Sequence, residues 1–145
     1  MEKLNFDSGI KEYELGAGIL RFNPSDPNVY ARFMTAIPEI KAIEDEMIEA
    51  GNDITDTADR LKLMQDADAK VKAQLDEIFP GNSFDQLLEG VSLMAVAGNG
   101  ERVVTNLLAA LTPIIEGGVQ TFANTAVSEA KLNRAQRRAA QKCMV

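Results

Sequence analysis

The feature that most constrains this fold is a run of apolar residues at helical spacing that begins just after Glu101. Such residues recur every three or four positions: Val103, Val104, Leu107, Leu108, Leu111, Ile114 and Ile115. This spacing places them all along one side of an α-helix. We therefore expect an amphipathic helix here, bent at Pro113 and hinged at Gly117-Gly118. A last helix from Val119 should carry its apolar residues on one side, and these are Phe122, Ala126, Val127 and Ala130.

Two more helices are expected in the segment 25–79. The first should run from about Pro27 to Ala50, and Pro38 inside it should kink or split it. The second should run from about Thr55 to Phe79. Its apolar seam has heptad-like spacing with one charged member: Leu61, Met64, Asp68, Val71, Leu75 and Ile78. The short connection between the two helices predicts a long antiparallel helical hairpin.

Residues 1–23 alternate apolar and polar side chains, as β-strands do. Leu4 and Phe6 alternate with polar residues, and so do Tyr13 and Leu15. Two or three short strands in a hairpin or small meander are expected, and they should pack on a helix because such a unit is marginal alone. The turn candidates are Asp7-Ser8-Gly9 and Gly16-Ala17-Gly18.

The remaining segment contains shorter elements. Ser83 can cap a short helix over Phe84–Glu89, and Val91–Ala97 should be a small helix or a buried turn. The predicted class is therefore α+β, mainly α, with about five helices in one domain spanning residues 1–145. Its parts are the β-hairpin or meander 1–23, the helical hairpin 25–79, the C-terminal helices 83–130 and a basic tail 131–145.

The residue types restrict the chemistry. The chain has no His and a single Cys, Cys143, so the usual general base and the usual zinc ligands are missing. The acidic groups around Asp53 and Asp66 lack the layout of a calcium loop and are typical of helix caps and solvated faces. We expect no catalysis, no metal site and no cofactor. A small enzyme that uses carboxylates alone is an alternative.

Charge is distributed unevenly. The net charge of −7 argues against sequence-independent nucleic-acid binding. The segment from Glu39 to Glu77 has twelve acidic and five basic residues, which form either a solvated face or a docking face for a basic partner. The tail from Lys131 to Lys142 is basic, so it either complements the helix dipole or contacts an acidic partner. A regulatory module that binds nucleic acid through this tail is the weaker alternative.

The expected location is the cytoplasm. The N-terminus has no apolar segment of signal-peptide length. The most apolar stretch, Val91–Ala97, is too short to cross a bilayer, so we expect no membrane partner.

The stripe of residues 103–115 has two interpretations. It either fills an ordinary core or receives an amphipathic partner helix, and both can hold for different edges of the helix. The candidate partner-binding residues are Leu107, Leu111 and Ile115 on this stripe, and Arg134, Arg137 and Arg138 for an electrostatic contact.

Three stretches together carry a family resemblance. They are Leu20-Arg21-Phe22-Asn23-Pro24-Ser25-Asp26-Pro27, then Phe79-Pro80-Gly81-Asn82-Ser83-Phe84, and Asn99-Gly100-Glu101-Arg102-Val103-Val104 with the tail Asn133-Arg134-Ala135-Gln136-Arg137-Arg138. In order and pattern the chain resembles the small tail assembly chaperones of long-tailed, siphovirus-like phages and prophages of Gram-positive bacteria. None of these motifs is a catalytic signature.

The resemblance implies a function without catalysis. Such chaperones coat the long, aggregation-prone tape measure protein before the tail tube polymerises around it. The implied partners are the tape measure protein and the tail tube protein, and self-association is a further expectation. The implied location is the host cytoplasm, with no copies in the mature virion. The alternative is a structural virion protein of the tail or of head completion.

Overall fold

The computed structural model describes residues 1–143, and for residues 132, 133, 135–137 and 139–143 it describes the backbone alone. The fold is mainly helical with an N-terminal antiparallel hairpin, which confirms the predicted class. Residues 1–143 contain four helices, not five. The elements are β1 (Lys11–Leu15), β2 (Gly18–Phe22), α1 (Pro27–Asn52), α2 (Thr57–Ile78), α3 (Phe84–Leu87) and α4 (Val103–Cys143).

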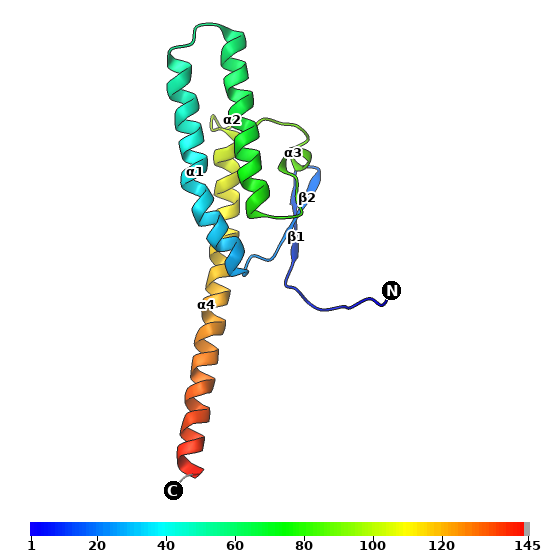
Figure 1. The fold of residues 1–145 in the computed structure, drawn as a ribbon, viewed down its shortest axis with the longest axis vertical. Coiled ribbons are helices and arrows are strands. Elements are labelled where there is room, and N and C mark those ends of the chain that lie inside the picture. The colour runs from blue at the N-terminus through cyan, green and yellow to red at the C-terminus, as the bar shows by residue number, and fades with distance from the viewer. Residues whose placement is uncertain (144–145) are drawn as a thin grey trace.

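Helices α1 and α2 form the expected antiparallel pair (Figure 1). Pro27 is the first residue of α1, and the Asp26 side chain caps the helix by accepting a hydrogen bond of 2.9 Å from the Asn28 backbone N–H. Pro38 does not split the helix, because α1 continues through it. Buried Phe33 and Ile40 lie on either side of the proline, so both halves of the helix pack against the same core.

The β-hairpin occupies only the second half of the predicted segment 1–23. Strands β1 and β2 pair with Tyr13 opposite Leu20, across a turn at Gly16-Ala17. Residues 1–10 form no strand, and the expected strand around Leu4 and Phe6 is wrong because both side chains are exposed. Alternation yields a strand only where a partner edge and an apolar surface are available.

The connection from α2 to α4 is mostly loop. Ser83 caps α3 as expected, and α3 ends at Leu87, two residues before the predicted end. The segment Val91–Ala97 contains turns and no helix, and it buries Leu93 and Met94 in the core. The Leu93 carbonyl accepts a hydrogen bond of 3.0 Å from the Val104 backbone N–H, so this loop places the start of α4.

Helix α4 is one continuous element of 41 residues. The expected bend at Pro113 and hinge at Gly117-Gly118 do not divide it, and the expected boundary between residues 130 and 131 also falls within it. Gly118 serves close packing instead: a Cβ atom there would overlap the Pro24 carbonyl oxygen. The missing side chain therefore lets α4 lie directly on the backbone of the segment before α1.

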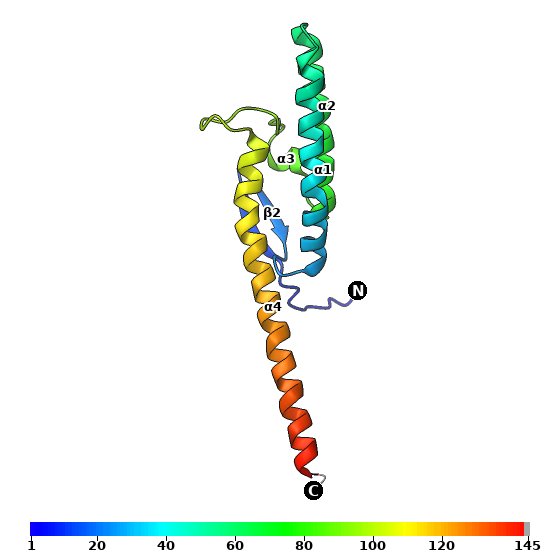
Figure 2. The same cartoon turned by 90° about the vertical axis from the view of Figure 1, so that its left-hand side faces the viewer.

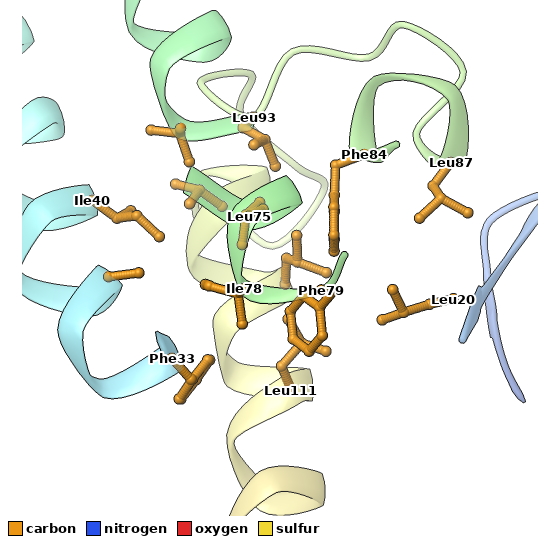
Figure 3. Packing of buried hydrophobic residues seen from close by; sticks show 14 of the residues in the cluster. Leu20, Phe33, Ile40, Leu75, Ile78, Phe79, Phe84, Leu87, Leu93 and Leu111 are labelled. Carbon is orange, nitrogen blue, oxygen red and sulfur yellow. The ribbon is translucent and has the colours of Figure 1, made fainter. Parts of the chain in front are cut away.

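The first part of α4 shares one core with the other elements. Figure 2 shows α4 and the hairpin lying along one side of the α1–α2 pair. In Figure 3, Phe79 at the end of α2 lies between Leu20 of β2 and Leu111 of α4. The Phe79 ring also contacts two other rings, with centroids 4.7 Å from Phe22 and 5.7 Å from Phe84. Burial of these rings fixes the hairpin and α3 to the helices.

Candidate partner-binding surface

The three apolar candidates from the sequence are core residues in this structure. Leu107, Leu111 and Ile115 are 6%, 3% and 2% exposed. They belong to the hydrophobic cluster that includes residues of α1, α2 and β2, and Figure 3 shows Leu111 within it. In this structure the stripe therefore fills the core, as the first of its two interpretations predicts. A partner cannot reach these three side chains while they are packed in this way.

Beyond Gly118, α4 leaves the body of the molecule (Figures 1 and 2). We call Val103–Gly118 proximal α4 and Val119–Cys143 distal α4. Every residue from Gln120 to Lys131 is exposed. A helix gains most of its stability from packing an apolar face, so a distal segment of this length lacks a major stabilising contact.

Distal α4 is amphipathic. One side, which we call the distal apolar face, consists of Val119, Phe122, Ala123, Ala126, Val127 and Ala130. Phe122 is 50% exposed and Val127 53% exposed, so both present apolar surface to solvent on the same side of the helix. The opposite side carries hydroxyl and amide groups, among them Thr125 and Ser128, whose hydroxyls donate to the backbone carbonyls of Thr121 and Asn124 at 3.1 Å. The apolar face is thus free to receive another protein surface.

The arginine candidates lie further along the same helix. Arg134 and Arg138 are exposed, and the side chain of Arg137 lies outside the described residues. Lys131, Arg134 and Arg138 follow one another at spacings of three and four, so they share one side of the helix. No acidic residue follows Glu129 in the sequence. Distal α4 therefore combines an apolar face with a positively charged end.

A second apolar surface lies at the free end of the α1–α2 pair. A groove of about 200 Å³, here called the hairpin groove, is lined by Met47, Ile48, Gly51, Asn52, Arg60, Leu63, Met64 and Arg102. Ile48, Met64 and the neighbouring Leu61 are exposed. The predicted apolar seam of α2 is buried only in its second half: Val71, Leu75 and Ile78 belong to the core, whereas Leu61 and Met64 are exposed.

Arg102 connects the hairpin groove to the start of α4. Its Nε atom lies 3.4 Å from Glu44 Oε1 on α1, and its Nη1 donates to the Met94 carbonyl at 3.0 Å. Arg102 directly precedes Val103, the first residue of α4. The groove therefore continues the side of the α1–α2 pair on which proximal α4 packs.

One ionic cluster around the buried Lys72 has a structural role. Lys72 Nζ lies 3.0 Å from Asp68 Oδ2 and 2.7 Å from Asp85 Oδ1, and Asp68 Oδ1 accepts a hydrogen bond of 2.7 Å from the Leu93 backbone N–H. Burial alone would lower the pKa of Lys72, but the hydrogen bonds and charges of Asp85 and Asp68 outweigh it and raise this pKa above its ordinary value. The cluster ties α2 to α3 and to the loop that leads into α4.

This cluster is what sequence reasoning missed. Asp68 was noted only as an interruption of an apolar seam, although Lys72 four residues later was the available sign of a paired charge. Among the residues that the structure describes, no three Asp, Glu, Cys or His side chains gather as a metal site would require.

Val91–Ala97 is the most apolar stretch considered from the sequence, and the structure adds one longer apolar helix segment within α4. Val103–Lys131 is long and apolar enough to cross a bilayer by length and composition. This is weak evidence for a membrane, because the core helix of a water-soluble protein passes the same test. Proximal α4 in this structure packs against protein.

Comparisons with known proteins identify no relative. No protein-family model matches the chain. No curated protein matches it. No solved structure matches it. The resemblance to tail assembly chaperones therefore stays a prediction from the sequence.

Proposed function

We propose that this chain is a phage tail assembly chaperone that binds the tape measure protein along the distal apolar face of α4 and assists tail tube assembly without catalysing a reaction. The observation that supports the proposal is distal α4 itself. It is an amphipathic helix whose apolar residues, Phe122 and Val127 above all, have no covering element within the described chain.

The chemistry of the proposed partner follows from this face. A long helical protein presents apolar stripes that self-associate unless they are covered, and an apolar helix face covers such a stripe by helix-to-helix packing. Burying one large apolar side chain contributes roughly 1–3 kcal/mol. A single copy therefore binds weakly enough to be displaced by tail tube protein, while many copies on one long client bind firmly through avidity.

The cationic end of distal α4 adds orientation. Acidic segments of the client would attract Arg134, Arg137 and Arg138. The same acidic segments would repel the rest of this chain, which is acidic. Because these groups are exposed, their contribution is screened by salt. Client binding should accordingly weaken, without disappearing, as ionic strength rises.

The proposed chaperone acts in the host cytoplasm and is released before the virion matures. A structural virion protein would instead stay in the particle. Mass spectrometry of purified particles separates the two functions, since the chaperone should be absent from particles that contain tape measure protein.

Co-expression with the tape measure protein tests the proposal. The wild-type chain should keep the client soluble and co-purify with it. Phe122→Glu places a charge on the distal apolar face and should abolish both effects. Ser128→Glu adds the same charge on the opposite side of the same helix and is the matched control that should retain them. A client that is equally insoluble with and without the wild-type chain would sink the proposal, and so would equal behaviour of the two variants.

A further inference from the structure

We infer that residues 3–7 of a second copy of this chain add to the open edge of β1 as a third strand. Within the described residues the sheet consists of β1 and β2 alone. Leu4 and Phe6 alternate with polar residues as in a strand, yet they are 89% and 78% exposed. An extended segment with this pattern is suited to pair with the edge of a sheet.

The two edges of the hairpin differ. At the outer edge of β2, the Asn82 side chain accepts a hydrogen bond of 3.1 Å from the Arg21 backbone N–H and donates one of 3.0 Å to the Arg21 carbonyl. Arg21 is opposite Glu12 in the hairpin, so these two residues form a pair that is not hydrogen-bonded across the strands. The N–H and C=O groups of Glu12, and of Glu14 two residues later, therefore point to the outer edge of β1. These are the groups that an added strand would bond.

The apolar side of this edge has room for large side chains. Tyr13 points to the apolar side of the hairpin, where its ring centroid lies 5.1 Å from that of Phe22. Between β1 and proximal α4 lies a cleft of about 470 Å³, here called the β1 cleft, whose lining includes Tyr13, Pro113 and Ile114. A third strand on β1 would continue the side of Tyr13 with its own apolar residues and bring them to the β1 cleft.

The opposite side of the edge is acidic. Glu12 and Glu14 are exposed there, and Glu12 Oε1 lies 3.4 Å from Arg21 Nε on β2. When Leu4 and Phe6 face the β1 cleft, Lys3 lies on the side of the two carboxylates, and opposite charges on adjacent strands attract. A shift of one residue would instead put the apolar side chains among the carboxylates, so both sides of the strand favour the same register.

The anchoring of residues 7–9 favours a strand from a second copy. The Gly9 backbone N–H donates to Asp7 Oδ1 at 2.8 Å, and Asn23 Nδ2 donates to the Ser8 carbonyl at 3.0 Å. These bonds hold the turn beside the end of β2, and the segment before it runs away from the hairpin (Figures 1 and 2). The chain's own segment would have to reverse within this anchored turn to reach the edge of β1. Two copies that exchange their segments need no such reversal and form both contacts in a closed two-fold pair.

The inference is independent of the proposed function. The edge of β1 and residues 3–7 are separate from the distal apolar face of α4, which the client would use. Phe122→Glu should therefore abolish client binding and leave the pair intact. Phe6→Ser should do the opposite, so a failure of one idea is distinguishable from a failure of the other.

Light scattering coupled to size exclusion, on the full chain over a range of concentrations, tests the pair. Wild type should change from monomer to dimer as the concentration rises. Phe6→Ser removes a large apolar side chain from the contact and should weaken the pair at least tenfold. Asn5→Ser introduces the same residue on the other side of the strand and is the matched control that should not. Both positions are exposed in the single molecule, so neither variant should unfold it.

Substitution of Glu14 tests the edge itself. Glu14→Pro removes an N–H that the hairpin does not use and blocks a third strand, so it should abolish dimerisation. Glu14→Gln retains the N–H and should still form the pair, and circular dichroism verifies that both variants fold. A mixture of Phe6→Ser and Glu14→Pro chains retains one intact segment and one intact edge. It should therefore associate more than either variant alone.

Amide hydrogen exchange locates the contact. The backbone N–H groups of Glu12 and Glu14 should exchange more slowly as the concentration of the wild-type chain rises. Protection that does not change with concentration would mean that the chain's own segment covers the edge, and it would overturn the inference. So would a wild-type chain that is monomeric at every concentration, a Glu14→Pro variant that dimerises like wild type, or a mixture that gains nothing.

Discussion

Proximal and distal α4 belong to one helix with one apolar periodicity, yet they differ completely in their surroundings. Large apolar residues of the proximal part, such as Leu111 and Ile115, are buried in the shared core, whereas Phe122 and Val127 of the distal part are half-exposed. Helical spacing therefore shows which residues share a face, and it does not show whether the molecule itself covers that face.

The border between the two parts is the contact of Gly118 with the backbone at Pro24. Up to this point α4 has the helix pair and the hairpin as neighbours, and beyond it no element of the described chain follows. If the proximal part has a structural role and the distal part an interaction role, the same kind of substitution should change the free energy of unfolding by different amounts in the two parts.

The largest effect is expected in proximal α4. Leu111→Ala removes a buried side chain beside Phe79 and leaves a cavity, so the free energy of unfolding should fall by about 3 kcal/mol. Urea denaturation followed by circular dichroism measures this change. A loss below about 1 kcal/mol would mean that proximal α4 does not share the core.

The ionic cluster below the start of α4 should have the next largest effect. Lys72→Met leaves Asp68 without its buried partner and should cost about 2 kcal/mol at neutral pH. Lys70→Met is the matched control, because Lys70 is exposed on the same helix and its loss should be nearly neutral. Equal costs for the two variants would contradict a structural role of the cluster.

The pH dependence of that difference has a definite sign. The folded-state pKa of Lys72 is raised above the ordinary value of 10.5, so folding favours the charged ammonium. Its contribution is therefore complete below about pH 10.5 and is lost as the pH rises through the raised folded-state pKa. The stability gap between wild type and Lys72→Met should be constant through the neutral range and shrink in strongly alkaline buffer. A gap that grows there would contradict this assignment.

Substitutions of the two adjacent glycines test the border between proximal and distal α4. Gly118→Ala places a methyl group against the Pro24 carbonyl and should destabilise the fold by at least about 1 kcal/mol. Gly117→Ala meets no neighbouring atom and should stabilise the helix by about 0.5–1 kcal/mol. Thermal unfolding of the two variants measures both changes in stability. A change of the same sign in both variants would show that α4 does not rest on Pro24.

These cases also show how far the sequence alone reaches. Local signals placed α1, α2 and the hairpin turn well, because caps, prolines, glycines and periodicity act over a few residues. Asp26 as a cap and Ser83 before α3 followed from side-chain chemistry in the same way.

What failed depended on distant neighbours. Gly117-Gly118 looked like a hinge because nothing local shows that Pro24 lies against Gly118. Leu61 and Met64 share the seam spacing of Val71 and Leu75 but are exposed, because spacing does not show how far along α2 the other elements cover the seam. Spacing also indicated Leu107, Leu111 and Ile115 as partner-binding candidates; the structure buries these side chains, and the exposed apolar residues Phe122 and Val127 lie on the continuation of that stripe.

The smallest effect is expected in distal α4, and it completes the comparison. Val127→Ala shortens a half-exposed side chain that touches no other element, so the free energy of unfolding of the dilute protein should change by less than about 0.5 kcal/mol. Alanine also has the higher helix propensity, which offsets part of any lost contact. Urea denaturation measures this value beside that of Leu111→Ala. If the two variants lost similar amounts, distal α4 would have to pack within its own molecule, and no client would be needed to cover it.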